Sequence, residues 1–261
     1  MTKRILEIDE AVAYIHRHLD DSLSLSRLAK HVAYSPYHFS RLFREQVGLP
    51  PLYYVSALRL QKAKDLLIHT DLSIRDIGLE IGQMSLGTFT TRFSECVGVT
   101  PAEFRRSLPQ VGTMKDSLIK LGVWQEIELH TSAYGVIEGT IQTNVPFEGF
   151  ILVGLFAKPI PEGIPIKGGL LSGPGAFALT GIKPGVYYLM ATAIPWGSKE
   201  HDILLPHASL RTRNHKPLIV SPDGRVEHQM VMLHEPRQDD PPILISLPLL
   251  MNNFLKRMGQ P

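Results

Sequence analysis

The first 110 residues place apolar positions at the spacing of amphipathic helices. One predicted helix is marked by five residues that share a helical face: Ile5, Ile8, Val12, Ile15 and Leu19. Five later positions carry Ser or Thr just before an apolar run, where such residues cap helices: Ser24, Ser35, Ser73, Ser85 and Thr100. This succession predicts an all-α front half.

Prolines and glycines mark the boundaries of these helices. Pro36 follows Ser35 as a first-turn proline, and Gly48 suits the position just after a helix. A long fourth helix is predicted from Pro50–Pro51 to about His69. Its predicted inward stripe is Tyr53, Ala57, Leu60, Ala63 and Leu67.

Two pairs of residues have the spacing of a capping box. In this motif the residue that caps a helix and the residue three positions later each bond the backbone N–H of the other through their side chains. These pairs are Ser73 with Asp76, and Thr100 with Glu103. Gly98, like Gly48, is predicted to follow the last residue of a helix. Together these signals predict a fifth, a sixth and a short seventh helix.

The front half also contains an internal repeat. Residues 23–54 recur about fifty positions later as residues 72–104, with a one-residue slip between the halves. Each copy reads as two short helices joined by a tight turn, which is a helix-turn-helix pattern. Two copies on one chain, joined by a helical spacer, can present similar helices to a ligand that itself repeats, such as double-stranded DNA.

The back half has a different composition. Residues 1–110 contain five prolines and five glycines, whereas residues 111–261 contain 15 and 16. Short apolar runs at 150–156, 177–182, 186–194 and 226–233 predict strands. Lys183-Pro184-Gly185 predicts a type II turn, and Pro222-Asp223-Gly224 predicts a second turn.

We therefore predict a two-domain fold. An all-α domain with two helix-turn-helix units covers residues 1–110, and a connector covers 111–130, of which Met114–Leu121 is predicted to be helical. A mainly antiparallel β-sandwich with a C-terminal helix covers 131–261. The apolar stripe of that helix is Leu247, Leu250, Met251, Phe254, Leu255 and Met258; it either closes the sandwich, docks on the helical domain or forms a dimer interface.

Charge and cysteine content place only weak limits on the partners and the cellular compartment of the protein. The formal charge is +2, so a nucleic-acid interface must depend on helix placement more than on bulk charge. The single cysteine, Cys96, excludes an intrachain disulfide and suits a reducing cytoplasm. The apolar run 150–156 is too short to span a bilayer, so we expect no membrane partner.

The third predicted helix offers the chemistry of base recognition. Tyr37, Ser40, Arg41 and Arg44 lie opposite its apolar face. Arginine can donate two parallel hydrogen bonds to guanine, and serine can bond polar base edges. Ser35 and the helix N-terminus favour a phosphate group nearby.

These motifs resemble the AraC/XylS family of transcription regulators. The resemblance covers about residues 5–107 and is carried by LSRLAKHVAYSPYHFSRLFREQVG, by RLQKAKDLL and by FTTRFSECVGVTPAEFRRS. It implies seven helices and promoter DNA as partner. It places the base-reading positions on Tyr37, Ser40 and Arg41, and on Leu86, Gly87, Thr90 and Thr91, with Ser85 and Arg92 beside them.

The second unit departs from the family's pattern. Gln83 follows Gly82, where an aromatic residue is usual, and the reading positions carry few strong hydrogen-bond donors. We therefore predict that the first unit supplies most of the base discrimination. The second unit would mainly contact the DNA backbone and thymine methyl groups.

The segment of about 134–195 is similar to carboxypeptidase-regulatory-like, or transthyretin-like, β-sandwiches. Family members often join the DNA-binding domain to an effector-binding or dimerising domain, so this part is predicted to bind an unidentified small molecule. The candidate contacts are Tyr187, Trp196, His201, His207 and Arg211. RNA polymerase and a second copy of the chain are further candidate partners.

Two other functions stay open at this point. One is a protein-interaction adaptor whose second DNA-binding unit has degenerated. The other is an enzyme in the back half, although Gly-rich phosphate loops, G-x-S-x-G and H-E-x-x-H motifs are absent from the sequence. His201–Asp202 is an adjacent acid–base pair without further context. We predict a transcription regulator with no catalytic residue, cofactor or metal.

Overall fold

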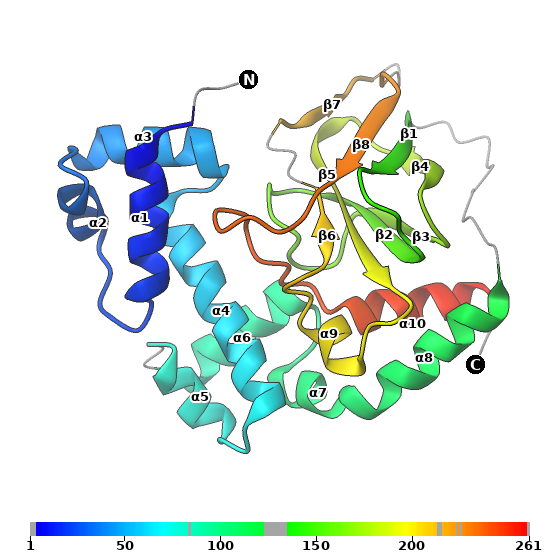
Figure 1. Ribbon diagram of the computed structural model, residues 1–261, viewed down its shortest axis with the longest axis horizontal. Helices are drawn as coiled ribbons and strands as arrows, with labels where there is room; N and C mark the ends of the chain where they lie inside the picture. Colours follow the sequence, from blue (N-terminus) through cyan, green and yellow to red (C-terminus); the bar gives the residue numbers. More distant parts are fainter. Residues whose placement is uncertain are drawn as a thin grey trace.

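The computed structural model describes residues 4–82, 85–122, 135–212, 216–222, 224 and 226–259. Gln83, Asp223 and the predicted connector residues 123–130 lie outside the described residues. Figure 1 shows helices α1 to α7 on one side of the molecule and the sheets on the other, with α8 and α10 along one edge of the sheets.

The front half is helical throughout, as the sequence predicted. Its helices are α1 (Leu6–Arg17), α2 (Leu25–His31), α3 (Pro36–Val47), α4 (Pro51–His69), α5 (Ile74–Glu80), α6 (Leu86–Val97) and α7 (Pro101–Arg106). All five predicted N-caps accept a bond from a backbone N–H of the helix that follows. The Thr100–Glu103 capping box is complete, whereas Ser73 and Asp76 bond through their side chains in the return direction.

The two helix-turn-helix units pack on matching aromatic pairs. Phe39 and Phe43 of α3 are fully buried, and so are Phe89 and Phe93 of α6. Their ring centroids lie 5.5 Å and 5.8 Å apart, which is contact distance for aromatic pairs. The repeat in the sequence is therefore a repeat in the core.

Helix α4 is buried more widely than its predicted stripe. Ala57, Leu60, Ala63 and Leu67 are buried as predicted. Tyr54 is buried in the helical core instead of Tyr53, which is partly exposed. The predicted stripe was too narrow because α4 packs on the C-terminal domain as well as on its own domain, so it has two buried faces.

Helix α8 (Leu108–Leu121) continues directly from α7 and contains the predicted helical segment Met114–Leu121. It begins inside the predicted boundary between the helical domain and the connector. It packs on α9 (Glu200–Leu204) and α10 (Leu247–Arg257), which belong to the C-terminal part of the chain. The helical domain and the C-terminal domain are thus joined by a helix that contacts both.

The C-terminal part contains two sheets. The strands are β1 (Gly135–Thr143), β2 (Gly149–Phe156), β3 (Lys167–Leu171), β4 (Gly175–Ile182), β5 (Gly185–Pro195), β6 (Leu210–Arg211), β7 (Leu218–Val220) and β8 (Gln229–Leu233). One sheet has the order β4-β1-β8, and the other has the order β3-β2-β5-β6, with β7 also paired to β5. The pairs are antiparallel except β1 with β8, which is parallel.

The two sheets face each other across an apolar core. This core includes Ile137 and Ile141 of β1, Phe177 of β4, and Ile151 and Val153 of β2. One turn prediction was wrong. Gly185 is not among the residues with a positive φ, so Lys183-Pro184-Gly185 is not a type II turn, and Gly185 instead begins β5.

Every residue of β2 is buried, because the larger sheet is covered on both faces. Its second face packs on a core that runs without interruption from the sheet into the helical domain. Phe150, Leu152 and Ile194 from the sheet and Met251 and Phe254 from α10 belong to the same cluster as the aromatic pairs of α3 and α6. The two domains therefore share one hydrophobic core.

Helix α10 contributes four of its six predicted stripe residues to this shared core, whereas Leu250 is partly exposed and Met258 is exposed. Leu247, Met251, Phe254 and Leu255 are buried within the chain, which favours the predicted closing and docking role. A dimer built on the same stripe would require α10 to leave its place. Within the described residues, no helix has the length and apolar character needed to cross a membrane.

Candidate nucleic-acid interface

The start of α3 presents polar side chains to solvent. The Ser35 hydroxyl accepts a bond from the backbone N–H of His38 at 3.4 Å, and Pro36 fills the first turn. Tyr37 is 83% exposed, which is unusual for an aromatic side chain in a folded domain. The exposed ring and the N-terminus of α3 form a surface suited to a phosphate and a base edge.

Farther along α3, the arginines predicted to contact DNA are exposed. Arg41 lies 3.5 Å from Glu45 in a pair one turn apart, and both side chains are about half exposed. An exposed pair of this kind contributes little stability, so the guanidinium can exchange its partner for a base at small cost. Arg44 is also exposed, and Ser40 is partly buried.

The start of α6 repeats the geometry of α3 with different side chains. Ser85 accepts a bond from the N–H of Thr88, again at 3.4 Å. Leu86 is 49% exposed, Gly87 and Thr91 are exposed, and Thr90 and Arg92 are partly buried. The surface has few donors, so it suits contacts with methyl groups and the DNA backbone more than base-edge hydrogen bonds.

Helix α4 separates the two units. Its 19 residues span about 28 Å at about 1.5 Å per residue. Successive major-groove faces of B-DNA lie about 34 Å apart. The spacer is therefore somewhat shorter than one turn of the duplex and of comparable length.

The first unit is supported from within the helical domain. Gln46 of α3 accepts a bond from the Ile5 N–H and donates one to Asp9. On α2, Arg27 donates to the Tyr14 hydroxyl and to Asp21. These bonds connect α2 and α3 to α1 and to the loop that follows it.

The second unit is also held by the C-terminal domain, at the last turn of α6. The Gly163 N–H donates to the Cys96 carbonyl at 2.6 Å, and the Ser246 N–H donates to the Val97 carbonyl at 2.9 Å. The side chains of Ile245 and Leu249 lie against Gly98, which ends α6 with a φ of 86°. We call these contacts the α6 clamp.

Two loops of the C-terminal domain and Leu249 of α10 form the α6 clamp. Gly163 lies in the loop 157–166 between β2 and β3, and Ser246 lies in the segment 241–247 that leads into α10. The Pro161 carbonyl accepts bonds from the N–H groups of Leu244 and Ile245, both at 3.0 Å, so the two loops are bonded to each other. They hold α6 as a connected pair.

Lys64 of α4 is the most buried charged residue at the domain boundary. Its side chain is 1% exposed, and its Nζ donates to the carbonyls of Ile243 and Leu244 at 3.0 and 3.2 Å. It also lies 5.4 Å from the centre of the Phe104 ring. Burial lowers the pKa of Lys64 to about 7, and Asp65 partly opposes this shift.

A second polar cluster at the boundary joins α4 to the loop 157–166. The Tyr53 hydroxyl donates to the Glu162 carboxylate, and Lys158 Nζ donates to the same carboxylate at 2.7 Å. Burial raises the pKa of Tyr53 to about 12, and its bond to Glu162 adds to the shift. The bond to Glu162 also raises the pKa of Lys158. The tyrosine therefore stays protonated as a donor at neutral pH.

The five predicted effector contacts occupy several different places. His207 contacts Asp65 and Gln61 of α4 at 2.7 and 2.6 Å, so it is part of the domain boundary. Arg211 is buried and donates to the carbonyls of Pro206, His207 and Ser209. Burial lowers the pKa of its guanidinium.

The remaining three candidates also have local contacts. Tyr187 donates to the Lys183 carbonyl, Trp196 packs against Phe150, and His201 is exposed on α9 beside Asp202. None of the five predicted residues lines the 320 Å³ cavity of the C-terminal domain, whose walls are described below. Among the described residues, no group of three or more His, Cys, Asp or Glu side chains is placed to hold a metal ion.

Lys64, Glu162 and the segments 157–166 and 241–247 were not singled out from the sequence. A lysine within a helix that is otherwise partly polar carries no local signal of burial. Its burial arises from a contact with residues about 180 positions away. No local pattern in one sequence reports such a contact.

Comparison with known proteins agrees with the geometry of the front half. A family model described as a helix-turn-helix domain matches residues 28–107. Regulatory protein PocR of Salmonella typhimurium is 35% identical over 102 residues, which cover 39% of this chain and 34% of the relative. The arabinose operon regulatory protein of Escherichia coli is 35% identical over 115 residues, covering 44% and 39%.

The N-terminal part of this chain is thus similar to helix-turn-helix domains and to part of the arabinose operon regulatory protein. The matching region begins in α2 and ends after α7, so it includes α3, α6 and the spacer α4. A solved structure of the DNA-binding domain of AdpA with a target DNA is 28% identical and covers 39% of this chain and 91% of that one, with a TM-score of 0.37. The chain spans about a third to two-fifths of the length of the relatives named above.

Proposed function

We propose that this protein is a sequence-specific DNA-binding transcription regulator. The observation that carries the proposal is the pairing of α3 and α6. Both helices start on a serine cap, both present exposed residues in their first two turns, and both bury an aromatic pair on the opposite face. The 19-residue helix α4 joins them, and its length of about 28 Å is comparable with the roughly 34 Å between successive major-groove faces.

Helices α3 and α6 make different kinds of contact with DNA in this proposal. Tyr37, Ser40 and Arg41 on α3 supply most of the base discrimination, and Arg44 contacts a phosphate. On α6, Leu86, Gly87, Thr90 and Thr91 contact thymine methyl groups and the backbone, with Arg92 beside them. The exposed arginine on α3 supports this division, since the contact of arginine with guanine is the commonest specific base contact.

The C-terminal domain controls the helical domain in this proposal, in response to a small molecule. The support is the α6 clamp together with the Lys64 bonds, through which a change in the C-terminal domain reaches α4 and α6 directly. We further infer a cytoplasmic protein that acts on promoters together with RNA polymerase, either alone or as a homodimer.

Selection of bound sequences from random duplex DNA tests this function. The full chain is used at several salt concentrations, because phosphate contacts weaken steeply with salt and base contacts do so less. A regulator should enrich one defined motif, and the motif should persist as salt rises. Binding without a motif, or no binding, would contradict the proposal and favour a protein-interaction adaptor.

A further inference from the structure

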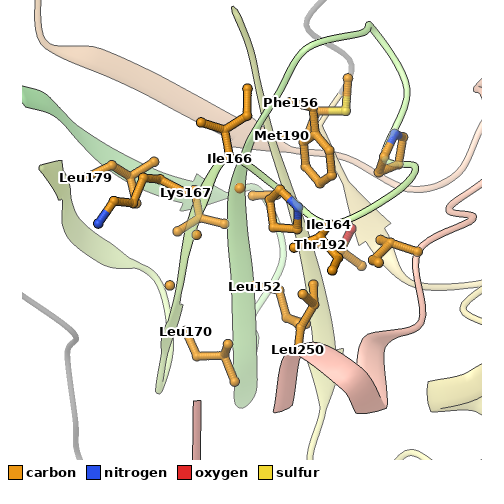
Figure 2. Close-up of a pocket in the computed structure, with 18 of the residues that line it drawn as sticks. Leu152, Phe156, Ile164, Ile166, Lys167, Leu170, Leu179, Met190, Thr192 and Leu250 are labelled. Carbon is orange, nitrogen blue, oxygen red and sulfur yellow. The ribbon is translucent and has the colours of Figure 1, made fainter. Parts of the chain in front are cut away.

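A cavity of about 320 Å³ lies between the larger sheet of the C-terminal domain and α10. Its walls come from β2, β3, β4 and β5, the loop 157–166, the segment 241–247 and one face of α10. Figure 2 shows side chains from the sheet, the loop and the helix surrounding one hollow. The labelled residues in this view are Leu152, Phe156, Ile164, Ile166, Lys167, Leu170, Leu179, Met190, Thr192 and Leu250.

We propose that this cavity binds a small, uncharged, mainly apolar molecule. A volume of 320 Å³ corresponds to about ten groups of the size of a water or a methylene, at roughly 30 Å³ each. This volume lies at the lower end of the range for small-molecule sites. A substituted benzene with about ten non-hydrogen atoms fits the cavity.

The lining decides the chemical class of the ligand. Leucine, isoleucine, phenylalanine, methionine, proline and glycine make up most of the walls. The charged residues among the lining residues are Lys167 and Arg257, and both have other partners in the structure. A charged ligand would lose its hydration in the apolar interior without a partner there, so an uncharged ligand is favoured.

The uncharged polar side chains among the lining residues are Thr180, Thr192 and Asn253. Thr192 of β5 is 6% exposed and lines the cavity. Figure 2 places its side chain at the hollow beside Ile164. A ligand that carries one hydroxyl or carbonyl group can form a hydrogen bond with the Thr192 hydroxyl.

The cavity also has an apolar rim that faces solvent. Ile164 is 65% exposed and Ile166 is 48% exposed, and both line the cavity from the loop 157–166. Leu250 of α10 lines the opposite side and is partly exposed. The loop and α10 therefore frame an entry that a small apolar molecule can use.

The same walls hold the second DNA-binding unit. Pro161 and Ile164 line the cavity and flank Gly163, whose N–H bonds to the last turn of α6. Ile243 and Ile245 also line it, and their segment bonds to Lys64 and to Val97. Resting on the proposed function, we infer that a bound ligand changes how firmly the clamp holds α6 and so changes the affinity for DNA.

Binding to the full chain is tested with three probes of similar size. These are 4-propylphenol, propylbenzene and 3-phenylpropionate, and binding is followed by ligand-detected NMR titration. We expect saturable binding of both uncharged probes, with the carboxylate at least about tenfold weaker because its charge must be desolvated. No saturable binding of either uncharged probe, or tighter binding of the carboxylate, would overturn the proposal.

Variants locate the site. Leu250→Trp fills the cavity and should weaken the binding of 4-propylphenol by at least about tenfold, because the pocket is blocked. Asn252→Trp, on the same helix but outside the lining, is the matched control and should leave affinity within about twofold. Equal binding by folded Leu250→Trp and the wild type would overturn the site.

A second variant keeps the test decisive if Leu250→Trp does not fold. Thr192→Val keeps the shape of the side chain but removes the hydroxyl. It should weaken the binding of 4-propylphenol by about two- to tenfold and leave the binding of propylbenzene unchanged, because only the phenol loses a hydrogen bond. An equal effect on both probes, or none on either, would contradict the assigned role of Thr192.

The effect on DNA is measured separately with the motif selected by the wild-type chain. Saturating 4-propylphenol should change the DNA affinity by at least about fivefold, which is the lower range of allosteric coupling. Ligand binding without this change would overturn the coupling to α6 and leave the site intact. Absence of DNA binding in both states would instead overturn the proposed function.

Discussion

Helices α3 and α6 are both 12 residues long, both begin on a serine cap and both end on a glycine in the left-handed region, with φ values of 87° and 86°. Their surroundings differ. The last turn of α3 is bonded to α1 through Gln46, whereas the last turn of α6 is bonded to two loops of the C-terminal domain. The repeat gives both helices the same construction, and the C-terminal domain holds one of them.

This difference suggests separate roles for the two units. The first unit has the exposed Arg41 and Tyr37, the side chains that we propose to contact bases. The second unit has weaker reading chemistry but direct bonds to the domain that contains the cavity. Recognition and control are then located on different copies of the same motif.

The largest effect on stability is expected from a pair of glycine substitutions. Gly48→Ala places a side chain on a left-handed residue, which costs about 1–2 kcal/mol. Gly98→Ala has the same backbone cost, but its Cβ would also lie 2.8 Å from Leu249 and 3.1 Å from Ile245. Overpacking adds about 1–3 kcal/mol.

Urea unfolding of both variants checks this comparison. The free energy of unfolding should fall clearly more for Gly98→Ala than for Gly48→Ala. Equal losses would show that the contacts of Gly98 with Ile245 and Leu249 contribute no stability. That result would contradict the α6 clamp.

The local construction of both units was predictable, because caps and helix ends depend on residues a few positions apart. Ser35, Ser85 and Gly98 have their predicted roles in the structure. The exposure of Tyr37 and Arg41 also follows from their position opposite the phenylalanines. Their contact with DNA stays a prediction.

The domain boundary was not predictable for the opposite reason. The burial of Lys64 and the contacts of Tyr53 and Tyr54 depend on residues from 109 to 184 positions away. The cavity is lined by β-strands, two loops and α10, which are distant in sequence. Amphipathic spacing reports that a face is buried, and it does not report which distant segment covers that face.

Cys96 provides a chemical probe of the clamped unit. It is the single cysteine of the chain, it is 9% exposed, and burial raises its pKa to about 11. At pH 7.5 its alkylation by iodoacetamide should be more than about a hundredfold slower than in the unfolded chain, because the thiolate is the reactive form.

The two glycine variants extend this prediction. Gly98→Ala should accelerate the alkylation of Cys96 by loosening the last turn of α6, and Gly48→Ala should not. Mass spectrometry over time measures both rates. Rapid alkylation of the native wild-type chain would contradict the burial of this turn.

Lys64 predicts a pH dependence of stability. Its pKa is about 7 in the folded chain, whereas the ordinary pKa of lysine, which applies to the unfolded chain, is 10.5. Between these values the unfolded chain binds more protons, so the free energy of unfolding rises with pH by up to about 1.4 kcal/mol per unit. Below pH 7 lysine is protonated in both states and its contribution is constant.

Lys64→Met removes this titration and keeps a long side chain in the same place. Urea unfolding at pH 6, 7, 8 and 9 should show a smaller rise in stability for the variant than for the wild type. The difference should appear above pH 7 and be absent below it. Parallel pH profiles would show that Lys64 is charged at the boundary throughout this range.

The smallest effect on stability is expected from removing the two serine caps. Ser35→Ala and Ser85→Ala should each lower the free energy of unfolding by about 1 kcal/mol. The two losses should be similar, since both caps accept one backbone bond at 3.4 Å. A clear inequality in thermal unfolding would show that the two helix starts are not equivalent.

The central claim is that the first unit reads the bases while the second is held for control. It is tested most directly by comparing the DNA motifs selected by the wild type, Arg41→Ala and Thr91→Ala. Arg41→Ala should relax the preference at one guanine by about 1–3 kcal/mol, whereas Thr91→Ala should leave the motif in place with weaker overall binding. An unchanged motif for Arg41→Ala together with a lost motif for Thr91→Ala would contradict the account.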